Sequence, residues 1–180
     1  DKALVSDLIF QLSNSNEYGA RDTLIESAGA VLDKEQIRQL IDRYMKYADR
    51  AIRDSDKRGA LHSVISLAEQ IGDAALFEQT WLKIEEKPWP KLWIAIARQY
   101  LLAGDADTAY NRLLRIPGDD KFESGEKNML LLEIYRHQGL EEKRTELLDQ
   151  MFRSNHSAAI LNALLESVGE ERRSELIEEA

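Results

Sequence analysis

Four glycines recur along this chain at intervals close to the length of a helical hairpin. Gly72, Gly104, Gly139 and Gly169 are separated by 32, 35 and 30 residues, and each follows a stretch with apolar residues at three- and four-residue spacing. Glycine readily adopts the left-handed conformation that ends a helix, so each one predicts a turn between two helices. A period of about 34 residues indicates hairpins that stack, because a single hairpin cannot bury its apolar face alone.

The remaining sequence also predicts helices and no strand. Before the first of these hairpins, we expect helices over about 2–13, 17–31 and 33–53, and the third begins where Asp33 and Gln36 form a capping-box pattern. No stretch alternates with period two for long enough to form a strand. The predicted fold class is therefore all-α.

The apolar residues of the first three helices have the spacing of buried stripes. Their periodicity predicts that these side chains point inward. They include Leu4, Leu8, Ile9, Leu12, Val31 and Ile52.

The stretch between Pro88 and Pro117 resembles one unit of the tetratricopeptide-repeat (TPR) family. The residues that carry the resemblance are Trp93, Ile96, Ala97, Tyr100, Ala109 and Leu113. Two departures are that Leu113 stands where the family has an aromatic residue and that Pro117 comes about one helical turn early. The resemblance covers about 57–180. It implies a TPR-like, right-handed α–α superhelix of about five stacked hairpins with an N-terminal capping helix, in a single α-solenoid domain (1–180) whose first 53 residues are divergent.

The resemblance also implies a binding surface. In TPR proteins the first helices of successive units line a concave groove that binds peptides or helices. The corresponding positions of this chain are His62, Ser66, Glu69, Ile94, Arg98, Leu101, Met129, Glu133 and Arg136. Trp89 lies between two prolines and is a further candidate, as an exposed aromatic anchor, although packing between repeats would also explain it.

Nothing in the sequence assembles a catalytic, metal or cofactor site. His62, His137 and His156 are scattered, and the phosphate-binding and nucleophile motifs of common enzyme folds are absent. We therefore expect a non-enzymatic protein without a cofactor. The predicted function is a scaffold or adaptor that binds a protein or peptide partner. The alternative is a self-associating or regulatory helical domain of a larger protein, and a homodimer is included in that alternative.

The charge balance limits the class of partner. The chain has 24 basic and 33 acidic residues, so its net charge is −9. Nucleic-acid binding requires clustered cations, and this balance argues against it. There is no cysteine and no apolar run of roughly 18 residues that would span a membrane. We expect no membrane insertion and a cytoplasmic protein.

Overall fold

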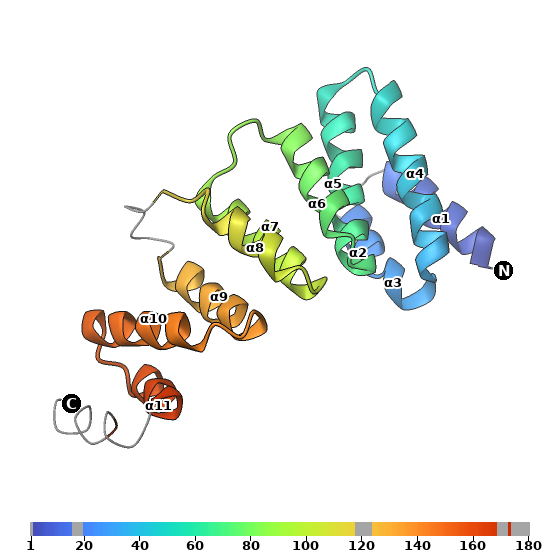
Figure 1. Ribbon diagram of the computed structural model, residues 1–180. Coiled ribbons are helices and arrows are strands. Elements are labelled where there is room, and N and C mark those ends of the chain that lie inside the picture. Colours follow the sequence, from blue (N-terminus) through green and yellow to red (C-terminus); the bar gives the residue numbers. More distant parts are fainter. Residues whose placement is uncertain (1, 16–19, 118–123, 169–172, 174–180) are drawn as a thin grey trace. The chain divides into compact units, whose positions relative to one another are not determined.

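The computed structural model describes residues 2–15, 20–117, 124–168 and 173. Within these ranges every regular element is a helix and no strand is present, which confirms the predicted all-α class (Figure 1). The helices are α1 (Lys2–Ser15), α2 (Ala20–Glu26), α3 (Ala28–Val31), α4 (Lys34–Arg50), α5 (Asp54–Ile71), α6 (Ala74–Ile84), α7 (Pro90–Leu102), α8 (Ala106–Leu113), α9 (Ser124–His137), α10 (Glu141–Ser154) and α11 (Ala158–Ser167).

The chain divides into two compact units. The N-terminal unit comprises residues 1–89 with 102–104, and the C-terminal unit comprises 90–101 with 105–180. The N-terminal unit therefore holds α1 to α6, and the C-terminal unit holds most of α7 and all of α8 to α11. The single domain over 1–180 stays a prediction.

The core of the N-terminal unit lies between α4, α5 and α6. Helix α5 packs against both α4 and α6 (Figure 1). The side chains of Leu40, Tyr44, Val64 and Leu67 are fully buried there. These residues have the helical spacing that a stripe facing a neighbouring helix requires, so burial of apolar area stabilises this arrangement.

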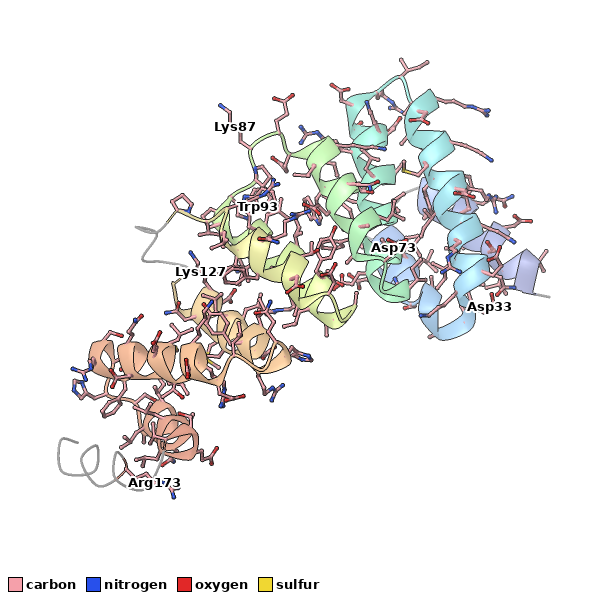
Figure 2. All side chains as sticks on the ribbon, in the orientation of Figure 1. Asp33, Asp73, Lys87, Trp93, Lys127 and Arg173 are labelled. Carbon is pink, nitrogen blue, oxygen red and sulfur yellow. The ribbon has the colours of Figure 1, made fainter. Side chains whose placement is uncertain are left out.

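Helix α4 begins at the capping box predicted from the sequence. The Asp33 side chain accepts a hydrogen bond from the Gln36 backbone N–H at 3.0 Å, and the Gln36 side chain accepts one from the Asp33 N–H at 3.0 Å. Two backbone donors that the first turn would leave unpaired are thereby satisfied. Figure 2 labels Asp33 at this end of the helix.

Helix α1 is attached to α4 by an aromatic and ionic cluster. The Phe10 ring lies 4.9 Å from the Tyr44 ring, centroid to centroid, and the Arg43 guanidinium lies over Phe10 at 4.3 Å. Arg43 also pairs with Asp7 at 2.6 Å. The Tyr44 hydroxyl is buried and hydrogen-bonds to Ser13 Oγ, so the polar end of this core residue has a partner.

The prediction of one continuous helix over 17–31 is wrong, because the described part of that range is split into α2 and α3. In an unbroken helix the Gly29 N–H would bond to the Ile25 carbonyl. Instead Gly29 N donates to Gln70 Oε1 at 2.7 Å, and Gln70 Nε2 donates to Ile25 O at 2.8 Å. The amide of Gln70, from α5, thus takes the place of one backbone hydrogen bond, which is a recognised cause of a break in a helix.

Three helices end in a left-handed glycine, as the sequence predicted. The φ angles are 74° at Gly72, 85° at Gly104 and 68° at Gly139. After each glycine, the next N–H donates at 2.9 Å to the carbonyl five residues earlier. This hydrogen bond closes a Schellman-type C-cap and reverses the chain within a short turn. The predicted turn at Gly169 lies outside the described residues.

An aspartate follows the first two of these glycines and starts the next helix. Asp73 Oδ1 accepts from Leu76 N at 3.0 Å, and Asp105 Oδ1 accepts from Thr108 N at 2.9 Å (Figure 2 labels Asp73). The backbone hydrogen bond from Thr108 holds the pKa of the Asp105 carboxyl below its usual value. The stability that this cap contributes is present above the unfolded-state pKa and is lost as the pH falls through the lower folded-state pKa.

In the C-terminal unit, arginine side chains lie over two aromatic rings of α7. The Arg115 guanidinium lies 4.7 Å from the centre of the Trp93 ring, and the Arg112 guanidinium lies 5.5 Å from that of Tyr100. Ala97 and Ala109 are fully buried. Small side chains at these positions allow a close approach of neighbouring backbones, and the cation–π contacts connect α7 to α8 and the residues after it.

Helices α9 to α11 share a second apolar core. Helix α10 packs against both α9 and α11. The Tyr110 ring of α8 lies 6.1 Å from that of Tyr135 in α9, which links this core to α8. Burial is the main cause that raises the pKa of Tyr135, and the adjacent Tyr110 adds to it. The buried residues of this core are Leu132, Leu148, Met151, Phe152 and Leu164.

Several apolar residues predicted to point inward are exposed. Ile9 and Phe10 turn toward the unit's interior, and the opposite side of α1 faces outward. Leu4 is 70% exposed, and Ile52 is 100% exposed because α4 ends at Arg50, before the predicted end at 53. The residues whose inward prediction was wrong are Leu4, Leu8, Leu12, Val31 and Ile52.

We predict that Gln70→Ala destabilises the N-terminal unit by about 1–3 kcal/mol, because the Ile25 carbonyl and the Gly29 N–H lose their partner. The free energy of unfolding, measured by urea denaturation, checks this. Gln79→Ala is the matched control, since Gln79 is exposed on α6. An equal free energy of unfolding for the two variants would show that the Gln70 hydrogen bonds do not stabilise the unit.

We predict that Gly104→Ala destabilises the protein by about 1–2 kcal/mol, because an L side chain is strained at positive φ. Gly125→Ala is the control. Gly125 lies in α9, and a Cβ there has nothing within 4 Å, so this change should be neutral or stabilising. Thermal unfolding of both variants makes the comparison. A stable Gly104→Ala protein would mean that the turn does not need a left-handed residue.

Candidate functional site

A cleft of the N-terminal unit lies between α2 and α5. Its volume is about 440 Å³. Helix α2 packs directly against α5, and the hydrogen bond from Gln70 Nε2 to the Ile25 carbonyl holds the end of α2 to α5. The lining residues are Asp22, Ile25, Glu26, His62, Ser63, Ile65, Ser66 and Glu69.

One wall of the cleft is a row of side chains along α5. His62, Ser66 and Glu69 are spaced by four and three residues, so they lie on the same helical face. All three residues are among the predicted binding positions, and all three line the cleft. The His62 ring packs edge-on against Trp81 of α6 at 5.3 Å between centroids, which restricts its orientation.

The opposite wall comes from α2, and sequence reasoning missed it. Asp22 and Glu26 are one helical turn apart and both line the cleft. Their spacing was a signal that they share a face. Nothing in the local sequence indicated that this face would lie opposite α5, because that depends on the Gln70 hydrogen bonds across 45 residues.

The cleft is acidic at its rim and apolar deeper inside. Asp22, Glu26 and Glu69 are exposed, whereas Ile25 and Ile65 are buried. Carboxylates accept charge-assisted hydrogen bonds from ammonium and guanidinium groups. In the described part of the chain, no group of three His, Cys, Asp or Glu side chains is placed to hold a metal ion. The chemistry suits binding of a cationic side chain.

The other predicted partner-binding residues lie outside this cleft. Trp89 is 45% exposed at the end of the N-terminal unit, and its ring contacts Trp81 edge-on at 6.1 Å. In the C-terminal unit, Arg98, Met129, Glu133 and Arg136 are exposed. Ile94 and Leu101 are only 2% and 7% exposed, so neither side chain is accessible to a partner in this structure.

Comparisons with known proteins do not assign the chain to a family. No protein-family model, no curated protein and no solved structure matches it. None of the helices over the described residues is both long and apolar enough to cross a membrane.

Proposed function

We propose that this chain is a non-enzymatic helical-repeat protein, of a TPR-like α-solenoid type, that binds a segment of another protein. Support comes from the three hairpins with the same glycine turn and the same closing hydrogen bond. The TPR-like residues Trp93, Ala97, Tyr100 and Ala109 add to it. Fold alone does not define a function, so the proposal depends on the cleft.

The α2–α5 cleft is the observation that carries this proposal. It presents the α5 row of His62, Ser66 and Glu69, which a TPR-like arrangement assigns to the binding surface, opposite the carboxylates of α2. A volume of about 440 Å³ accommodates a few side chains of an extended segment. Its polar rim and apolar interior are typical of a ligand-binding site.

The chemistry of the cleft defines the segment that would bind. A lysine or arginine side chain pairs with Glu26 and Glu69 at the rim. An adjacent apolar side chain contacts Ile25 and Ile65 inside. The net charge of −9 attracts such a basic segment and so increases its association rate.

A peptide-binding experiment tests the proposal. A dye-labelled peptide of alternating arginine and leucine should bind, and the same peptide with glutamate for arginine should not. Glu26→Lys/Glu69→Lys should lower the affinity about tenfold or more, measured by fluorescence anisotropy, because attraction becomes repulsion.

The matched control is Glu142→Lys/Glu146→Lys, which makes the same charge change at exposed positions of α10. Circular dichroism would verify that both variants are folded. If the control lowers the affinity as much as the cleft variant does, the peptide responds to net charge and the cleft is not the binding site.

The second candidate function is self-association, favoured by the outward side of α1. Leu4, Leu8 and Leu12 recur every four residues there and are exposed. Pairing of this face with the same face of a second copy would bury all of them, as in an isologous dimer. Sedimentation velocity at increasing concentration should then show a dimer, and Leu8→Glu should abolish it. A monomer at all concentrations contradicts this candidate.

A further inference from the structure

A small basic hollow lies between the start of α5 and the end of α6. Its volume is about 180 Å³, and it is separate in position from the α2–α5 cleft. Leu61 and Ile84 are buried and form its inner wall. Lys57, Arg58 and Lys83 line it and are exposed.

The three cations of this hollow have no anionic partner within the described residues. None of them forms an ion pair or a side-chain hydrogen bond there, although the chain contains more acidic than basic residues. Other arginines of the same unit are paired, as Arg43 is with Asp7 and Arg53 is with Asp56. These three positive charges are therefore available to an anionic ligand.

The surroundings of the hollow combine positive charge with apolar surface. Besides Leu61 and Ile84 inside, Ile52 is fully exposed two residues before Asp54, which also lines the hollow. An isoleucine exposed on all sides gains free energy when a partner covers it. The complementary ligand is thus anionic and also carries an apolar group.

We propose that this hollow binds an acidic–apolar segment of a partner protein. A carboxylate of that segment pairs with Arg58 and Lys83, and Lys57 adds to the attraction. A neighbouring apolar side chain enters against Leu61 and Ile84. The space of about 180 Å³ suits one such side chain with its carboxylate. This inference does not depend on the α2–α5 cleft, whose charge is opposite.

The apolar wall of the hollow distinguishes a peptide from a phosphate-bearing ligand. Asp54 lines the hollow, and Asp56 lies in the same first turn of α5. The buried side chains of Leu61 and Ile84 line the same hollow, and an apolar side chain next to a carboxylate covers them, whereas inorganic phosphate does not. A nucleic acid would in addition need cations spaced along its backbone, whereas here they surround one small space.

Fluorescence anisotropy with a designed peptide tests the proposal. The probe is dye-labelled Gly-Glu-Leu-Asp-Leu-Glu-Gly, compared with versions in which lysine replaces each acid or glycine replaces each leucine. We expect the acidic peptide to bind with an affinity that decreases as salt is added. The lysine version should not bind, and the glycine version should bind more weakly because the apolar wall is left uncovered.

Arg58→Glu/Lys83→Glu should lower the affinity for the acidic peptide about tenfold or more, since both pairings become repulsive. The control is Lys46→Glu/Lys143→Glu, an equal charge change at exposed positions of α4 and α10. An equal loss in the control overturns the proposal, as does the absence of salt-sensitive binding. Displacement of the peptide by inorganic phosphate or duplex DNA at comparable concentration also overturns it.

Sedimentation of the same variants separates a partner from a second copy. If Arg58→Glu/Lys83→Glu alone removes a concentration-dependent dimer, the occupant is another molecule of this chain and the assignment to a partner protein is wrong. An unchanged affinity of the Glu26→Lys/Glu69→Lys variant for the acidic peptide would show that the hollow binds independently of the cleft.

Discussion

The left-handed glycine at the end of a helix is the constraint on which this structure depends most. At Gly72, Gly104 and Gly139 it allows the following N–H to reach the carbonyl five residues earlier. The chain therefore reverses within a few residues, and the next helix must return along the previous one. An aspartate placed directly after the first two glycines starts that helix at once. Short turns of this kind favour contacts between sequence neighbours.

A second interaction, the Gln70 bridge, determines the shape of the N-terminal unit. A glutamine amide offers both a carbonyl acceptor and an NH2 donor, so it can replace an N–H···O=C pair of a helix. By bonding to Ile25 and Gly29, it separates α2 from α3 and holds both against α5. The α2–α5 cleft follows from this, because the carboxylates of α2 then lie opposite His62 and Glu69.

The N-terminal unit carries two hollows of opposite charge along the same helix. The acidic cleft lies beside the middle and end of α5, and the basic hollow lies beside its first turns. Exposed charges act over about 10 Å at ordinary salt concentrations, so each hollow attracts ligands mainly through its own side chains. Opposite local charges on one unit favour partners whose charge pattern matches, which contributes specificity more than affinity.

The sequence by itself determined the local structure. A glycine after a stretch of helical periodicity predicted each of the turns at Gly72, Gly104 and Gly139, and the Asp33–Gln36 pattern predicted the capping box. Helical periodicity itself predicted the all-α class. Each of these signals is carried by residues close to one another in the sequence. Only the tertiary structure decided which apolar faces are buried and where a cleft opens. Leu4 and Ile9 are both apolar residues of α1, yet only Ile9 is buried. Which of them faces a neighbour depends on contacts with residues distant in sequence, such as Phe10 with Tyr44 and Gln70 with Ile25, and no local pattern encodes these.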